Sequence, residues 1–195
     1  AGILLCYIPC FLAFYPGIFN NDMVWQWEMY TYQNYSTHHP LLHTLFASSV
    51  FEAGKKLFGS YNAGLAIHSL FQLLVLSASE AFALRALIKR GCTGRAICIT
   101  GGFFALYPYL PVMGLSTTKD SLFGPMFLFL FVLLWEMLES RKWFSTKKLA
   151  AVFLLIVLSC MFRNNASHCY LLVAFFLAAC WARGCFLHRA RNQEA

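Results

Sequence analysis

Long apolar runs recur along this chain, and they constrain its fold more than any other feature. After an opening run at 2 to 19, further runs occur near 63 to 84, 96 to 115, 121 to 138, 149 to 162 and 169 to 182. Hydrophobic residues make up 59% of the chain and charged residues only 12%, whereas soluble domains average about 45–50% and about 25%. Because a membrane-spanning helix needs roughly 20 apolar residues, the sequence predicts an all-α, polytopic transmembrane helical bundle with about six spans.

We expect one membrane domain over residues 1–195, and we expect the chain to be a fragment of a longer protein. Residues 1–19 read as a truncated first span, because an apolar run is already under way at the first residue. Residues 20–60 are expected to form an outer interfacial loop. Five further spans are expected within 61–187, followed by a cytoplasmic tail at 188–195.

Lysine and arginine residues are distributed unevenly between the two sides of this bundle. Eleven of them fall in the segments 85–95, 141–148 and 183–191. By the positive-inside bias these segments are cytoplasmic, so the loops 20–60, 108–120 and 163–168 are extracytoplasmic. The net charge of +7 is therefore a topology signal. Nucleic-acid binding is not expected, because the basic residues are divided among three short segments rather than forming one stripe.

The segment 20 to 60 is too polar to span a bilayer and unusually rich in aromatic residues. Its first part, about 22 to 35, contains Trp25, Trp27, Met29, Tyr30, Tyr32 and Tyr35. Such residues are typical of the headgroup level of a membrane. The second part begins after Pro40, which suits the first turn of a helix. The sequence therefore predicts two interfacial helices in this loop.

Asp22, His38 and His39 are the first candidate site residues in this loop. Asp22 lies just outside the expected first span, where an acid commonly caps a helix start, and taken alone that explanation is the stronger one. Imidazoles at a membrane surface bind phosphate, relay protons or hold a metal, but they also occur simply as interfacial residues. What favours a functional site is that the acid and both imidazoles occur on the same outer face.

Lys119, Asp120 and Arg163 are the other candidates, and all three fall in expected outer turns. Lys119 and Arg163 serve equally well as anchors at the headgroups or as phosphate ligands, and Asp120 suits a helix start. His39 and His43 have helical i, i+4 spacing, but the sequence contains no HExxH or CxxC pattern. No cofactor is therefore expected, and a divalent metal has no support.

Within the second run, His68, Gln72 and Ser79 share one helix face. Polar side chains at membrane depth usually face the bundle interior and pair there, so hydrogen bonds between helices are predicted, with a substrate groove as the alternative. In the third run, Pro108 and Pro111 predict a bend.

A first span ending in Tyr15-Pro16-Gly17, an acid soon after it, and His38-His39-Pro40 in an outer loop together resemble the GT-C superfamily of polytopic glycosyltransferases. The likeness to its protein mannosyltransferase-like and aminoarabinose transferase-like members covers roughly residues 10 to 168. It departs from the family by ending after about six expected spans, where such enzymes have more. The resemblance implies a location in the bacterial plasma membrane.

The resemblance also implies an activity, namely transfer of a sugar from a polyprenyl-phosphate-linked donor to an extracytoplasmic acceptor. Asp22 matches the family's catalytic base, and Lys119-Asp120 resembles its later acidic motif. Lys119, Arg163 and His38 or His39 would then bind the phosphate, with the lipid-linked donor and membrane lipid as partners. Two other classes stay open: a multi-pass transporter, which the polar second span favours, and a non-catalytic membrane assembly protein.

Overall fold

The computed structural model describes residues 2–140, 146–175 and 178. Eight labelled helices follow one another in the order α1 (Gly2–Ala13), α2 (Asn21–Thr31), α3 (Leu41–Phe58), α4 (Tyr61–Lys89), α5 (Gly94–Leu106), α6 (Tyr109–Leu115), α7 (Asp120–Ser140) and α8 (Thr146–Phe162). The described residues contain no strand, and their one β-type pairing is an isolated bridge between Ile18 and Ser116. The all-α prediction is therefore confirmed.

The chain divides into two compact units, 1–163 and 164–195. The first unit holds α1 to α8, and the second contains a short apolar helix, Ala166–Phe175. The expected tail, the end of the last apolar run and five of the basic residues behind the topology prediction lie outside the described residues: 188–195, 179–182, Arg141, Lys142, Arg183, Arg189 and Arg191.

Two helices in the described part of the chain are long and apolar enough to cross a membrane, α4 and residues 120–138 of α7. α5 and α6 qualify together as a third crossing that is bent by 45°. The bend lies at Pro108, one of the two prolines from which the sequence predicted it. Proline has no N–H to continue the helical hydrogen bonds. The described residues thus contain two to three candidate spans, consistent with a membrane protein, and the expectation of about six crossings stays a prediction.

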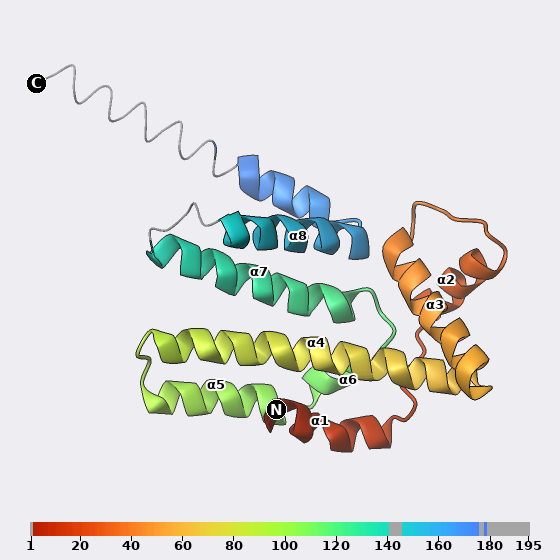
Figure 1. Cartoon of the computed structure of the whole chain (residues 1–195), viewed down its shortest axis with the longest axis horizontal. Coiled ribbons are helices and arrows are strands. Elements are labelled where there is room, and N and C mark those ends of the chain that lie inside the picture. Colours follow the sequence, from red (N-terminus) through yellow and green to blue (C-terminus); the bar gives the residue numbers. More distant parts are fainter. Residues whose placement is uncertain (1, 141–145, 176–177, 179–195) are drawn as a thin grey trace, which may run out of the picture. The chain divides into compact units, whose positions relative to one another are not determined.

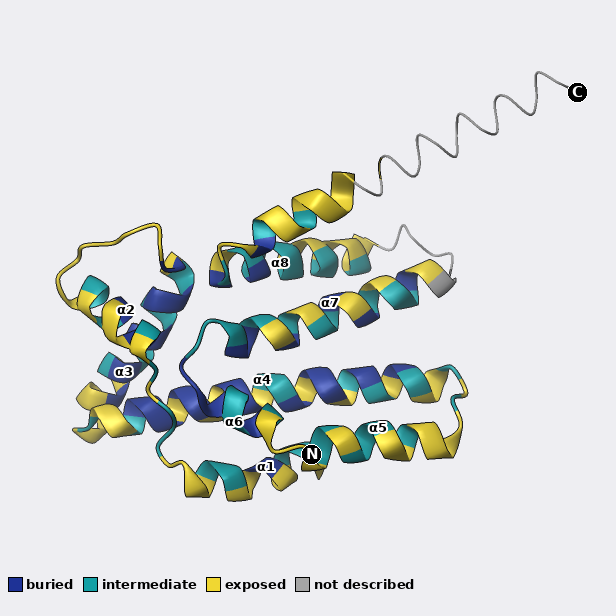
Figure 2. Cartoon of the chain, turned by 180° about the vertical axis from the view of Figure 1, so that it is seen from behind, coloured by how far each residue is buried: buried dark blue, intermediate teal, exposed yellow. Residues whose placement is uncertain are grey.

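α4 is the central helix of the first unit, since it packs against α1, α3, α5, α6 and α7. Figure 1 shows α4, α5, α7 and α8 running side by side, with α2 and α3 gathered at the end where α4 begins. α7 begins and α8 finishes toward this same end. Figure 2 shows that the buried positions of α4 continue along most of its length. Loops far apart in the sequence therefore meet at one end of the bundle.

The loop predicted to carry two interfacial helices does contain two helices, α2 and α3. Ser60 caps the following helix α4 by accepting a hydrogen bond from the N–H of Asn62 (3.2 Å). α3 ends at Gly59, whose positive φ of 72° gives the left-handed turn that commonly closes a helix. Two helices are present as expected, although α2 ends at Thr31 rather than near residue 35, and their placement at a membrane surface stays a prediction.

The predicted polar face of α4 is buried, but its members behave differently. His68, Gln72 and Ser79 are all 0% exposed. With its amide nitrogen turned toward α6, Gln72 donates to the carbonyls of Gly114 (3.1 Å) and Ser116 (3.2 Å), as expected for a polar group between packed helices. Ser79 instead donates to the Leu76 carbonyl of its own helix (2.7 Å).

α3 and α4 cross with their backbones in direct contact. A Cβ atom added at Gly54 would lie 2.1 Å from the backbone nitrogen of Gly64, and one added at Gly64 would lie 2.6 Å from the Cα of Phe51. Small residues permit this close approach, which is a common way for helices to pack in membranes. The crossing fixes the position of α3, and therefore of the histidines near its start.

We expect Gly54→Ala to lower the free energy of unfolding by about 1–3 kcal/mol, because its methyl group would have to push two backbones apart. Gly102→Ala is the matched control, since nothing lies within 4 Å of a Cβ atom at that position. Alanine there should stabilise α5 by about 0.5–1 kcal/mol. Denaturation of the two variants in the same detergent would measure both effects. Equal stabilities would show that α3 and α4 do not cross at these glycines.

Candidate functional site

The stretch after α1 pairs with the stretch between α6 and α7. The N–H of Ile18 donates to the carbonyl of Leu115 (2.9 Å), and the N–H of Thr117 donates to the carbonyl of Ile18 (3.0 Å). Next along the chain, the N–H of Asn20 donates to Oγ1 of Thr117 (2.9 Å). This pairing holds the starts of α2 and α7 side by side, although almost a hundred residues separate them.

Gly17 makes this close approach feasible. Its φ is +142°, and an added Cβ atom would lie 2.1 Å from Oγ of Ser69 on α4 and 3.3 Å from the carbonyl oxygen of Leu115. A side chain would therefore clash on one side and strain the backbone as well. The glycine of the Tyr-Pro-Gly motif thus has a structural role at the base of the site.

Asp22 uses its carboxylate for an ion pair rather than for capping. Asn20 is the N-cap of α2, since its side-chain oxygen accepts from the N–H of Asp22 (3.2 Å). Oδ2 of Asp22 lies 3.4 Å from Nζ of Lys119, with the two side chains 45% and 26% exposed. The capping explanation therefore applies to Asn20, and Asp22 is left to contact groups from another part of the chain.

Asp120 and Arg163 form a second ion pair, through Oδ1 and a guanidinium nitrogen. The guanidinium carbon of Arg163 also lies 5.1 Å from the centre of the Phe123 ring. Since Lys119 and Asp120 are neighbours in sequence, the two acid–cation pairs adjoin at the start of α7. Four of the six predicted site residues are thus brought together by contacts.

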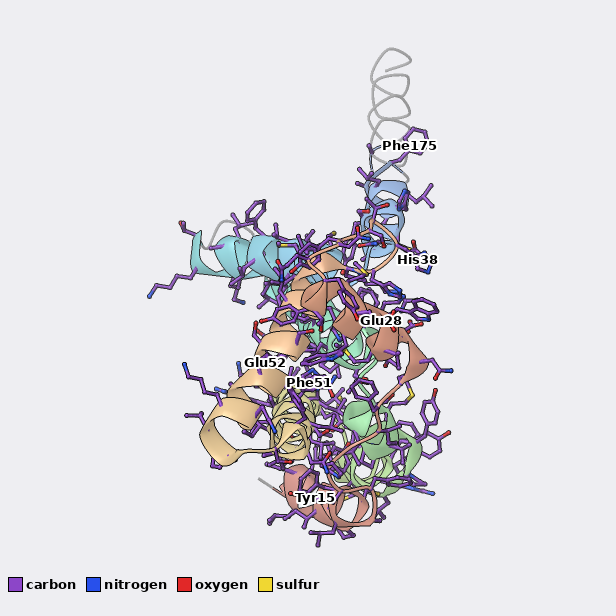
Figure 3. All side chains as sticks on the ribbon, turned by 90° about the vertical axis from the view of Figure 1, so that its right-hand side faces the viewer. Tyr15, Glu28, His38, Phe51, Glu52 and Phe175 are labelled. Atoms are coloured by element: carbon purple, nitrogen blue, oxygen red, sulfur yellow. The ribbon has the colours of Figure 1, made fainter. Side chains whose placement is uncertain are left out.

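His38 and His39 join Asp22 in the wall of a cavity of about 670 Å³ between α2 and the loop that follows it. The other lining residues are Trp25, Glu28, Met29, Tyr32, Asn34 and Ser36. Figure 3 looks at this end of the bundle and labels His38 and Glu28. Aromatic rings, two acids and two imidazoles therefore surround one space, and Asp22 connects that space to the ion pairs.

His39 is the more buried of the two imidazoles, at 7% exposed, and the two rings are 4.8 Å apart between centres. Nδ1 of His39 has no hydrogen-bond partner. Burial lowers the pKa of His39, while the nearby Asp22 carboxylate acts in the opposite direction. A buried ring nitrogen without a partner, close to a carboxylate, is a group that a ligand hydroxyl or phosphate oxygen can satisfy.

A second cavity, of about 310 Å³, lies deeper in the bundle. Asp120 is one of its lining residues. Its other lining residues come from α4, the α5–α6 pair and α7, and include Leu76, Glu80, Phe104, Met113 and Leu128. The walls are mostly apolar. Asp120 therefore stands between the polar end of the bundle and an apolar interior space.

The comparison with protein families gives one result, a match of residues 28–186 to DUF6020, described as a family of unknown function. This match covers most of the chain. The chain belongs to the DUF6020 family. The comparison with curated proteins found no match, and neither did the comparison with solved structures.

In this DUF6020 chain the matched region contains His38, His39, Lys119, Asp120 and Arg163, whereas Asp22 lies before it. No group of three or more metal-binding side chains occurs among the residues that the structure describes. The two ion pairs, Asp22 with Lys119 and Asp120 with Arg163, suit an anionic ligand. Lysine and arginine recognise phosphate oxygens, and both are only partly neutralised by half-exposed carboxylates.

Behind the site lies a buried polar cluster that the sequence reasoning missed. Oε1 of Gln26 is 2.6 Å from Nδ1 of His43 and accepts a hydrogen bond from Thr44 (3.1 Å), and all three side chains are 0% exposed. His43 stood out only for its spacing from His39. Gln26 has no local signal, because a glutamine in an aromatic-rich helix gives no indication of its burial.

This cluster predicts a measurable pH dependence of stability. Burial lowers the pKa of His43 from its ordinary 6.5 to about 4. Between pH 4 and pH 6.5, His43 therefore binds a proton more readily in the unfolded chain than in the folded one. The free energy of unfolding thus falls as the pH falls from about 6.5 to about 4. The loss attributable to His43 is at most about 3 kcal/mol.

We expect His43→Asn to flatten this dependence, because asparagine keeps a donor toward Gln26 but does not titrate. Thr44→Val is the matched control, since it removes another hydrogen bond from the same cluster without removing a titratable group. The control should lower stability by a similar amount at every pH. Unfolding measured across the pH range would test the assignment, and an unchanged slope in His43→Asn would refute it.

Proposed function

We propose that this DUF6020 protein is a membrane glycosyltransferase, which transfers a sugar from a polyprenyl-phosphate-linked donor to an extracytoplasmic acceptor. The resemblance to the GT-C superfamily motivates the reaction class. The observation that carries the proposal is the position of Asp22, which pairs with Lys119 at 3.4 Å and lines the cavity of about 670 Å³. A carboxylate, a cation and a cavity that admits a sugar therefore meet at one point.

The chemistry requires a base and a stabilised leaving group. Asp22 would take the proton from an acceptor hydroxyl as that oxygen attacks the anomeric carbon. The bond between that carbon and the phosphate oxygen breaks, and the polyprenyl phosphate departs with the electron pair. Lys119 and Arg163 would meet the negative charge that develops on the phosphate. The proton ends on Asp22 and is then released to water.

Lys119 and Arg163 are each paired with an aspartate in the structure. Donor binding to these cations would therefore release the Asp22 carboxylate to act as the base. An ion pair between partly exposed groups contributes only about 0–1 kcal/mol. The donor phosphate, a diester with one negative charge, could contact Lys119 and Arg163 together, and the second charge that develops as polyprenyl phosphate departs would strengthen both contacts. Its arrival would free the Asp22 carboxylate at the moment when an acceptor needs it.

The cavity walls suit the remaining parts of the substrates. Trp25 is 62% exposed and Tyr32 is 78% exposed, and such rings offer flat apolar surfaces with a polar edge, against which a sugar ring can stack. The deeper cavity beside Asp120 is apolar and would take the lipid chain. Phosphate binding between the two cavities would then place the reacting carbon near Asp22.

We expect Asp22→Asn to lower kcat/KM for sugar transfer from a polyprenyl-phosphate-linked donor by about 10²-fold or more, because general base catalysis typically contributes that much. Glu52→Gln is the matched control, since Glu52 lies on α3 and accepts a hydrogen bond from Tyr61 (3.3 Å), away from the cavity. The control should keep wild-type turnover. Unchanged turnover in Asp22→Asn would refute the base assignment.

A multi-pass transporter is the second candidate, because Glu80 and His68 are buried in the long helix α4. Ionisable groups inside a membrane bundle commonly mark a transport path. A transporter should move a solute across proteoliposomes without consuming a lipid-linked sugar. Asp22→Asn should then leave transport intact, whereas substitution of Glu80 should abolish it.

A further inference from the structure

Glu80 is a buried acid that the proposed reaction does not use. It lies in the second half of α4 and is 1% exposed. Its two carboxyl oxygens are 2.8 and 2.7 Å from Oη of Tyr7 on α1. The same Tyr7 oxygen is 2.8 Å from the backbone carbonyl oxygen of Phe104 on α5. One phenol therefore contacts an acid and a carbonyl that come from two other helices.

The Phe104 carbonyl needs a donor from outside its own helix. In a continuous helix it would accept from the N–H four residues on, but that residue is Pro108, which has no N–H. The N–H of Tyr107 donates to Phe103 instead (3.0 Å). A backbone carbonyl left without a donor in an apolar interior costs several kcal/mol. Tyr7 is the group placed to satisfy it.

The number of protons available to these contacts favours a neutral, protonated Glu80. A phenol carries one proton and accepts through its oxygen lone pairs. If that proton goes to Phe104, the contact between Tyr7 and Glu80 is a hydrogen bond only when the acid is the donor. An ionised Glu80 would instead leave a single proton, that of Tyr7, for three oxygen contacts below 3 Å, whereas a neutral Glu80 supplies a second proton.

The surroundings offer no charge to balance an ionised Glu80. Glu80 contacts Tyr7 of α1, which has Cys6 and Cys10 nearby and also contacts the Phe104 carbonyl of α5. Tyr109 and Asp120 share the cavity of about 310 Å³ that Glu80 lines. Within the part of the chain that the structure describes, no lysine, arginine or histidine forms an ion pair with Glu80.

We propose that Glu80 is a buried proton-binding site, held as the neutral acid that donates to Tyr7 while Tyr7 donates to Phe104. The ligand of this site is one exchangeable proton, and the cavity shared with Asp120 gives it a path toward the start of α7. Release of the proton would draw the Tyr7 hydrogen to the carboxylate and leave the Phe104 carbonyl bare. Proton release therefore loosens the contact between α1 and α5. This proposal does not depend on glycosyl transfer.

Infrared spectroscopy of the whole chain in lipid nanodiscs at neutral pH tests the proposal. The difference spectrum between wild type and Glu80→Gln should show the carbonyl stretch of one protonated carboxylic acid, shifted on transfer to D₂O. Glu136→Gln is the matched control, because Glu136 lies 3.5 Å from Lys89 and 3.7 Å from Lys148. The control should keep the band. Loss of a carboxylate band in Glu80→Gln, with no acid band lost, would overturn the proposal.

Tyr7→Phe gives an independent test that does not require Glu80→Gln to fold. Removing the hydroxyl takes away the acceptor of the acid proton, so the wild-type acid band should move to higher frequency as its hydrogen bond weakens. Cys6→Ala on the same helix should leave the band in place. A band that is unmoved by Tyr7→Phe would show that the observed acid is not Glu80, and the proposal would fail.

Discussion

The short backbone pairing of residue 18 with residues 115 and 117 is the constraint on which the candidate site depends. Two backbone hydrogen bonds and two bonds of the Thr117 hydroxyl, which accepts from the N–H of Asn20 and donates to the carbonyl of Ile18, join segments that are almost a hundred residues apart. They bring the first turn of α2 beside the first turn of α7. Asp22 can therefore reach Lys119, and Asp120, next along the chain, can reach Arg163. Without this pairing the acids and cations of the two ion pairs would belong to unrelated loops.

The acids of this protein have different surroundings, which give them different chemistry. Asp22 and Asp120 are partly exposed and paired with cations, and ion pairs of this kind contribute little to stability. Glu80 is buried and contacts the Tyr7 phenol, in a part of the bundle where each backbone group must find a partner. The break at Pro108 creates the unsatisfied carbonyl that gives Tyr7, and through it Glu80, a defined role.

The sequence predicted helices and their breaks well because these depend on local features, such as apolar runs, Pro40 and Pro108. It also selected the residues that form the two ion pairs, since charge in an apolar chain is conspicuous. It could not predict which acid pairs with which cation, because that depends on long-range backbone pairing without a local pattern. The burial of Gln26 and His43 and the contact of Tyr7 with Glu80 were missed for the same reason.

Cross-linking tests the central pairing most directly. Ile18→Cys and Ser116→Cys, introduced together after the native cysteines are replaced, occupy facing positions of the bridge, where Cα atoms lie within the range that a disulfide can join. We expect this pair of cysteines to form a disulfide rapidly in the membrane-embedded chain under mild oxidation. Ile18→Cys with Lys89→Cys, at the far end of α4, should stay reduced. Failure of the 18–116 pair to form, in a chain that is otherwise folded, would contradict the arrangement of the whole site.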